Sequence, residues 1–266
     1  MERFIDNRYH DVIRNDYPGL VQRIRTAADK TGIAVLENFI HPDFLAELRA
    51  SVDQLTPLSY QSGKRKPLRG SDLNDSGFSE VAFSDFMVQL ANDILAGSNV
   101  HLEASDIHAV VGILVGDEGQ DAVKEWHFDA TYLTCAMPIV MPPPGERDGK
   151  FRIWPNVRKF SQSRWRNRLY WNLAKIGLLR RLVKSYTVNF VPGNLYFFYG
   201  FRSYHGTEEL DTRALRANCL INFGGPFFDL EKGKTIEYGK QGARGQLSTA
   251  TPAPNEVQSP VLTPRR

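Results

Sequence analysis

Two side chains that could bind a metal ion stand two positions apart in the stretch Glu125–Thr134. This stretch is rich in aromatic and β-branched residues, which favour a β-strand. Because side chains alternate between the faces of a strand, His127 and Asp129 are expected to point the same way. A second histidine from elsewhere would complete a facial triad of two histidines and one carboxylate, which holds Fe(II) and leaves coordination positions open.

The chain contains another His-x-Asp triplet at His41–Asp43. Pro42 suits the first turn of a helix, and the acidic Asp43 suits the positive end of the helix dipole. We therefore interpret this triplet as a helix start. For His127 and Asp129 the alternative to a metal site is a half-buried, polar strand edge, so the rest of the chain must decide.

His205 is the best candidate for the second histidine. The second histidine should lie on a later strand of the same barrel, and His205 follows the turn signal Pro192–Asn194 and the predicted strand Leu195–Tyr199. The other histidines either precede the main series of strands, lie at a loop-like junction or lie on an earlier strand where a hydrogen-bonded structural role is favoured: His10, His41, His101 and His108.

An arginine stands inside the otherwise apolar predicted strand Leu215–Phe223. A buried guanidinium is costly unless an anion meets it, and its planar fork suits a carboxylate bound by two hydrogen bonds. Asn218 and Asn222 are expected on the same strand face as Arg216. The alternative for Arg216 is a salt bridge to an internal Asp or Glu.

The elements that must position these residues change in character near Asp106. Upstream of it the patterns predict three helices and one strand: Tyr17–Thr31, Ile33–Phe39 (the strand), Pro42–Leu55 and Ser79–Leu95. Downstream, short strands alternate with turn residues: Ile107–Val115, Glu125–Thr134, Lys150–Trp154, Tyr186–Phe190, Leu195–Tyr199 and Leu215–Phe223. Helices followed by short strands predict an α+β protein built on a double-sheet barrel or jelly roll.

A basic helix is predicted between two of these strands, over Ser161–Lys184. Its apolar residues recur at helical spacing: Trp165, Leu169, Leu173, Ile176, Leu179 and Val183. A helix packed on the barrel with a solvated charged face is the favoured interpretation, and a lid, an oligomer contact or a membrane-surface helix are the alternatives. We expect one domain over residues 1–240, with a helical N-terminal region at 1–100, a barrel at 101–225, the insertion at about 160–184 and a disordered tail at 241–266.

Composition narrows the class of protein. Lys and Arg number 33 against 30 Asp and Glu, and this small excess does not indicate nucleic acid binding. Cys135 and Cys219 make no disulfide framework, which favours a reducing compartment. The N-terminal residues lack the apolar core of a signal peptide, and no apolar run is long enough for a transmembrane segment, so we expect a cytoplasmic protein. The oligomeric state is not readable.

Together, the motifs resemble those of the Fe(II)/2-oxoglutarate-dependent dioxygenases. The resemblance rests on His127-x-Asp129, a Pro-Gly turn into an apolar strand, His205, and Arg216 eleven positions later. The stretch Gly32–Arg49 resembles the start of the phytanoyl-CoA-dioxygenase-like branch. The resemblance covers roughly residues 30 to 225 and does not include the inserted basic segment.

The resemblance implies a double-stranded β-helix of the cupin-like kind and a hydroxylase-type oxidoreductase. His127, Asp129 and His205 would be the catalytic Fe(II) ligands. Arg216 would bind the far carboxylate of 2-oxoglutarate, with Asn218 where the family often has Ser or Thr, and O2 would take the remaining position. Succinate and CO2 would be released, with hydroxylation as the usual outcome and desaturation, ring closure or epimerisation as others. Asp129 argues against a halogenase, which leaves that position to a halide.

The substrate is expected to be a small molecule met by variable loops: residues 59–75, residues 142–150 and the inserted helix. The basic residues of the first loop favour a carboxylate-bearing substrate, with a solvated basic loop as the alternative: Lys64, Arg65, Lys66 and Arg69. Two other functions use the same barrel. One is a cupin-like metal-dependent isomerase or oxygenase that does not use 2-oxoglutarate, and the other is a catalytically silent binding module.

Overall fold

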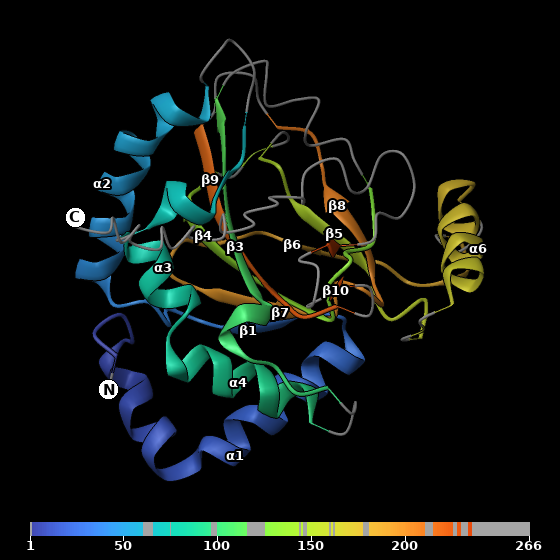
Figure 1. Ribbon diagram of the computed structural model, residues 1–266, viewed down its shortest axis with the longest axis horizontal. Helices are drawn as coiled ribbons and strands as arrows, with labels where there is room; N and C mark the ends of the chain where they lie inside the picture. Colours follow the sequence, from blue (N-terminus) through green and yellow to red (C-terminus); the bar gives the residue numbers. More distant parts are fainter. Residues whose placement is uncertain are drawn as a thin grey trace, which may run out of the picture.

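The large sheet of the protein carries helices on one face and a smaller sheet on the other (Figure 1). The computed structural model describes residues 2–60, 66–74, 76–96, 100–115, 126–143, 145, 148–159, 161, 163–177, 181–210, 215–225, 228–229 and 234–235. Within them, the large sheet has the strand order β1-β7-β4-β9-β3-β2, and the small sheet has the order β6-β5-β8.

Helices precede most of the strands along the chain, in the order that the residue patterns predict. The α-helices are α1 (Asn7–Lys30), α2 (Pro42–Ser59), α3 (Gly77–Ala82), α4 (Asp85–Leu95) and α6 (Arg164–Lys175). The strands of the two main sheets are β1 (Ala34–Leu36), β2 (Leu68–Arg69), β3 (Ile107–Val115), β4 (Leu133–Val140), β5 (Phe151–Trp154), β6 (Tyr186–Val188), β7 (Leu195–Phe198), β8 (Tyr204–Thr207) and β9 (Leu215–Phe223). A short pair, β10 (Phe228–Asp229) and β11 (Lys234–Thr235), follows them. None of the helices in these ranges could cross a lipid bilayer.

The alternation of side chains along the long strands produces the two layers. One set packs against α1 to α4, and in β9 it consists of Ala217, Cys219, Ile221 and Phe223. The residues between them face the small sheet, where Ala136 and Leu220 pack with Phe151 and Ile153 of β5. This antiparallel two-sheet core confirms the predicted α+β jelly roll, the double-stranded β-helix.

Several predicted boundaries were wrong for local reasons. Of the strand predicted over Glu125–Thr134, residues 126–132 form no regular strand, because regular pairing of β4 begins only at Leu133; Glu125 lies outside the described residues. The single helix predicted over Ser79–Leu95 is two helices, since Ser84 caps α4 by accepting a hydrogen bond from the Met87 N–H at 3.2 Å. The loop expected between α2 and α3 contributes β2, an edge strand of the large sheet.

The inserted helix is shorter than predicted. It ends at Lys175 because Gly177 takes a left-handed conformation, with φ of 83°, and donates to the Ala174 carbonyl at 3.0 Å. Lys64, Arg65 and the tail 241–266 lie outside the described residues. The division into one domain and a tail stays a prediction.

Gly32, which follows the C-terminal end of α1, offers a test of how α1 docks on the barrel. Its φ is +83°, and a Cβ added there would lie 2.4 Å from Cβ of Pro155, just beyond β5. Gly70 also has a positive φ, of +50°, but a Cβ there would meet nothing within 4 Å. We expect Gly70→Ala to cost about 1 kcal/mol of unfolding free energy from backbone strain, and Gly32→Ala about 2–4 kcal/mol from strain and the collision. Urea denaturation measures both, and equal losses would contradict the docking.

Candidate metal centre

His127 and His205 face each other across an isolated antiparallel bridge. The N–H of each residue donates to the carbonyl of the other at 2.9 Å, and the two ring centroids lie 4.6 Å apart. Residues directly opposite in such a bridge project their side chains to the same side. His205 is provided by β8, and His127 by the segment before β4. The two imidazoles therefore meet although the predicted strand around His127 is absent.

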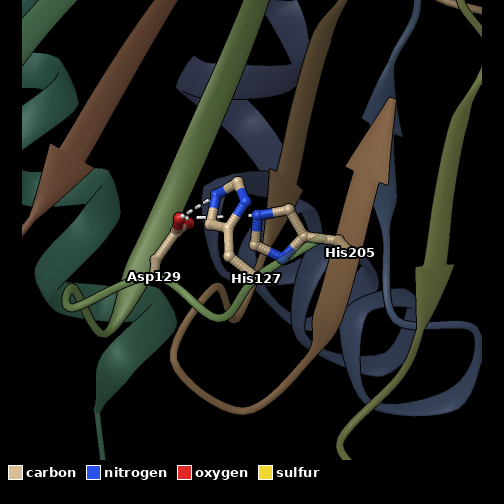
Figure 2. Close-up of side chains that lie close together, drawn as sticks. All are labelled: His127, Asp129 and His205. Atoms are coloured by element: carbon tan, nitrogen blue, oxygen red, sulfur yellow. Dashed lines mark ion pairs between the residues drawn. The ribbon is translucent and has the colours of Figure 1, made fainter. Parts of the chain in front are cut away.

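The carboxylate of Asp129 completes the cluster (Figure 2). Its Oδ1 lies 3.3 Å from Nε2 of His127 and 3.4 Å from Nε2 of His205. The potential ligand atoms of the three residues lie within 4.8 Å of one another. Neighbouring ligands at about 2.1 Å from an octahedral metal are roughly 3 Å apart, so the separations from Asp129 suit one shared cation.

The hydrogen bonding of His205 supports this interpretation. Its Nδ1 lies 2.9 Å from the Ser203 carbonyl, which can only accept, so Nδ1 carries the proton. In a neutral imidazole the lone pair of Nε2 then faces Oδ1 of Asp129, an arrangement that is repulsive until a cation lies between them. A backbone carbonyl that fixes the tautomer is the usual support of a metal-binding histidine. These residues fit a divalent metal.

Asp129 is held on its other side. Its N–H donates to the Gly200 carbonyl at 3.0 Å, and its Oδ2 accepts a 2.6 Å hydrogen bond from the Thr134 hydroxyl. Burial alone would raise the pKa of Asp129, but the charge and the N–H donors of protonated His205 and His127 outweigh it and hold this pKa well below its ordinary value. A metal cation between neutral imidazoles and the carboxylate would lower the pKa in the same direction. The carboxylate is thus ionised. A Cβ at Gly200 would lie 2.0 Å from Oδ2, so only glycine fits beside it.

Arg158 joins the two segments that carry the cluster. Its buried guanidinium lies between the rings of Phe128 and Phe201, 4.1 Å and 3.9 Å from their centroids. It also donates to the carbonyls of Phe201 and Asp129. Because Phe128 sits between His127 and Asp129, this stacking restrains the approach of both ligands.

Arg216 is also buried, with 4% of the residue exposed, on the inner face of β9. With its amide oxygen turned toward the guanidinium, Asn218 accepts from Nε and Nη2 of Arg216 at 3.2 Å and 3.0 Å and donates to the Ala217 carbonyl at 3.2 Å. Both residues therefore lie on the face that the strand pattern predicted.

An aromatic wall connects Arg216 with the histidine cluster. The ring of Phe151 lies 5.5 Å from the ring of His205, and Phe190 stacks on Phe151 at 5.1 Å. The guanidinium of Arg216 is 6.0 Å from the Phe190 centroid. The cation and the candidate metal ligands thus flank one apolar surface.

Sequence reasoning missed the residues that support the cluster. Thr134 and Gly200 act through contacts across the fold, and nothing in their local pattern marks them. Arg158 stands in a turn whose pattern predicts only a surface residue. A sequence signal existed only for Phe151 and Phe190, which lie in the predicted strands beside the site.

Solved structures confirm the fold. A Pseudomonas putida prolyl-4-hydroxylase is 13% identical and covers 77% of this chain and 94% of its own, with a TM-score of 0.52. The non-heme alpha-ketoglutarate-dependent epimerase SnoN from nogalamycin biosynthesis is 16% identical, covering 85% and 95%, with a TM-score of 0.54. EctD from S. alaskensis with bound Fe is 16% identical, covering 75% of each chain, with a TM-score of 0.56.

At these identities the likeness concerns the fold alone, and the three proteins include a non-heme alpha-ketoglutarate-dependent enzyme and one with bound Fe. The sequence matches no protein-family model and no curated protein. The phytanoyl-CoA-dioxygenase-like branch therefore stays a prediction.

The hydrogen bond from Thr134 to Asp129 generates a test of the centre. Thr134→Val keeps the shape of the side chain but leaves Oδ2 of the carboxylate without its donor. We expect Co(II), titrated anaerobically as a stand-in for Fe(II), to bind ten- to a hundredfold more weakly. Thr131→Val is the matched control, because the Thr131 hydroxyl is buried but contacts Asn222 and Thr134 instead of Asp129. Equal losses in the two variants would contradict a metal role for Asp129.

Proposed function

We propose that this protein is a non-haem Fe(II)- and 2-oxoglutarate-dependent oxygenase that oxidises a small-molecule substrate, with hydroxylation as the expected outcome. The observation that carries the proposal is the convergence of His127, Asp129 and His205 at one end of an aromatic wall that has buried Arg216 at the other. Fold neighbours support it, since EctD was crystallised with Fe, and also with 2-oxoglutarate and 5-hydroxyectoine.

His127, Asp129 and His205 would hold the iron. When bound, Fe(II) would supply oxygen activation coupled to the conversion of 2-oxoglutarate into succinate and CO2. Burial of Asp129 and His205 keeps bulk water from two of the three ligands, whereas the His127 side chain is 35% exposed and marks the open side of the centre. Substrate is therefore expected to approach past His127.

Arg216 would bind the carboxylate of 2-oxoglutarate that lies away from the metal. A carboxylate is the natural partner for a desolvated guanidinium, and the stacked Phe151 and Phe190 would line the carbon chain between the two ends. Asn218 would act as a positioning residue, because its amide oxygen fixes the plane of the guanidinium through Nε and Nη2. This role differs from that of the Ser or Thr often found in the family.

Succinate formation tests the proposal. Wild-type protein with Fe(II), ascorbate and 2-oxoglutarate should form succinate, and Asp129→Ala should abolish it. Arg216→Ala should raise the KM for 2-oxoglutarate by about a hundredfold, because it removes charge-assisted hydrogen bonds. Arg216→Lys keeps the positive charge but loses the two parallel N–H donors, so its KM for 2-oxoglutarate should lie between those of the wild type and Arg216→Ala. A metal-dependent activity that survives Arg216→Ala unchanged would favour the isomerase or 2-oxoglutarate-independent oxygenase, and no metal binding would favour a silent module.

Two basic residues of the loop 59–75 that the structure describes, Lys66 and Arg69, have different surroundings. Lys66 is exposed and pairs with Asp72 at 3.1 Å. Arg69 is half-buried, and its Nε has no hydrogen-bond partner among the residues that the structure describes. Burial lowers the pKa of Arg69. A desolvated guanidinium whose Nε lacks a partner in the described part of the chain would be stabilised by a bound anion.

Arg69 also lies on the inner side of the large sheet. It pairs with Val110, which pairs with Leu220, which pairs with Ala136 of β4. Three inter-strand spacings of roughly 4.8 Å place its backbone about 14 Å from β4, within reach of a substrate that spans the sheet. We therefore propose that Arg69 binds a carboxylate of the substrate.

Paired compounds test this role of Arg69. Carboxylic acids and their methyl esters would be screened for stimulation of succinate formation, and we expect acids to be preferred at least tenfold. Arg69→Gln should remove the preference without changing the KM for 2-oxoglutarate, and Lys66→Gln should keep it. A preference that survives Arg69→Gln, or the absence of any, would refute the substrate assignment and leave the oxygenase proposal standing.

A further inference from the structure

The most exposed apolar side chains of the described residues are gathered in and just after α6. Trp165, Ile176 and Leu182 are 72%, 71% and 74% exposed, whereas the other exposed large apolar residues in the described ranges reach at most 48%. Large apolar side chains concentrated in one surface segment mark an interaction site. The segment lies at the edge of the molecule, away from α2 (Figure 1).

The exposed stripe is a second apolar face of the helix. At about 100° per residue, Trp165, Leu169 and Ile176 fall within roughly 40° of one another. Trp171 and Ala174 lie on the other side and pack on the barrel with Trp154 of β5, Tyr204 of β8 and Phe128. The helix is therefore already anchored, and its outer stripe is left for another partner. The structure therefore bears out the prediction that the helix packs on the barrel, but the packed face is not the Trp165 stripe.

Positive charge surrounds this stripe. Residues 164–184 contain seven Lys or Arg and no Asp or Glu: Arg164, Arg166, Arg168, Lys175, Arg180, Arg181 and Lys184. Arg166 lies on one flank of the stripe, and Arg168 and Lys175 lie on the other. All three are exposed, and no acidic residue of the described chain pairs with them.

We propose that the outer face of α6 and of Ile176, which follows it, binds the surface of an anionic lipid membrane. Trp165, Leu169 and Ile176 would enter the boundary between headgroups and acyl chains, and the flanking cations would contact lipid phosphates. A helix with basic flanks and an apolar stripe that includes tryptophan has the composition of such interfacial helices.

Other partners fit the same face less well. Nucleic acid would match the charge but would leave the aliphatic stripe in water. A second copy of the chain would cover the stripe but would bring two acid-free basic segments together, and like charges repel. An anionic bilayer satisfies both features at once.

Vesicle sedimentation with the full-length chain tests the proposal. Binding is expected to vesicles of phosphatidylcholine with phosphatidylglycerol, not to phosphatidylcholine alone, and should weaken with salt. Arg166→Glu with Arg168→Glu should weaken binding at least about 25-fold, at roughly fivefold per charge. Arg14→Glu with Lys30→Glu makes the same net charge change on exposed residues of α1 and should have little effect.

The apolar contribution is tested separately. Trp165→Ser with Ile176→Ser should weaken binding about tenfold or more, whereas Phe83→Ser with Leu58→Ser, at exposed apolar positions outside the segment, should not. Brominated lipids should quench tryptophan fluorescence in the wild type. Trp165→Phe should keep the binding and lose most of that quenching.

Four results would overturn the proposal. One is no binding to either kind of vesicle. Another is an equal loss of binding in the α1 control. The third is a dimer in analytical ultracentrifugation that Trp165→Ser with Ile176→Ser converts to a monomer, because the stripe would then serve a second copy. Binding of duplex DNA that is tighter than vesicle binding, and unaffected by Trp165→Ser with Ile176→Ser, would likewise assign the face to polyanions.

Discussion

The reciprocal backbone hydrogen bonds between His127 and His205 set the distance between the two imidazoles. They connect the segment that leads into β4 of the large sheet with β8 of the small sheet. The two sheets are therefore brought together at this end of the barrel. The rest of the centre depends on this bridge. Asp129 reaches both rings because its backbone N–H donates a hydrogen bond to the carbonyl of Gly200, which lies between β7 and β8. A cluster of this kind is assembled by long-range pairing, and the bridge restrains it before any ligand binds.

Electrostatics explains why the surroundings are arranged as they are. A buried carboxylate and two buried or half-buried imidazoles are costly unless their hydrogen bonds and charges balance. Thr134 and the Ser203 carbonyl satisfy the atoms that point away from the centre, which leaves Oδ1 and Nε2 for a cation. Arg158 and Arg216 are buried cations with aromatic neighbours. Arg158 packs on Phe128 beside the metal ligands, and Arg216 lies near Phe190 at the other end of the aromatic wall. The basic charge of α6 lies outside, where lipid phosphates could reach it.

Local patterns predicted the features of this structure that depend on periodicity. The two-residue alternation placed Arg216 and Asn218 on the inner face of β9, and the order of turns and strands singled out His205. Patterns failed where contacts across the fold decide. The segment around His127 has strand composition but makes one bridge, and α6 has two apolar stripes, so periodicity could not tell which of them faces the barrel. The branch, the domain division and the roles of the site residues stay predictions.

Anaerobic titration of the Fe(II)-loaded protein with 2-oxoglutarate tests the central claim most directly. If the three side chains bind iron and leave positions open for the keto acid, a visible charge-transfer band should grow and saturate at an equimolar ratio. The band should be absent in Asp129→Ala, and Arg216→Ala should require far more 2-oxoglutarate to reach it. A wild-type protein that binds iron without developing the band, or an Asp129→Ala variant that retains it, would contradict the account.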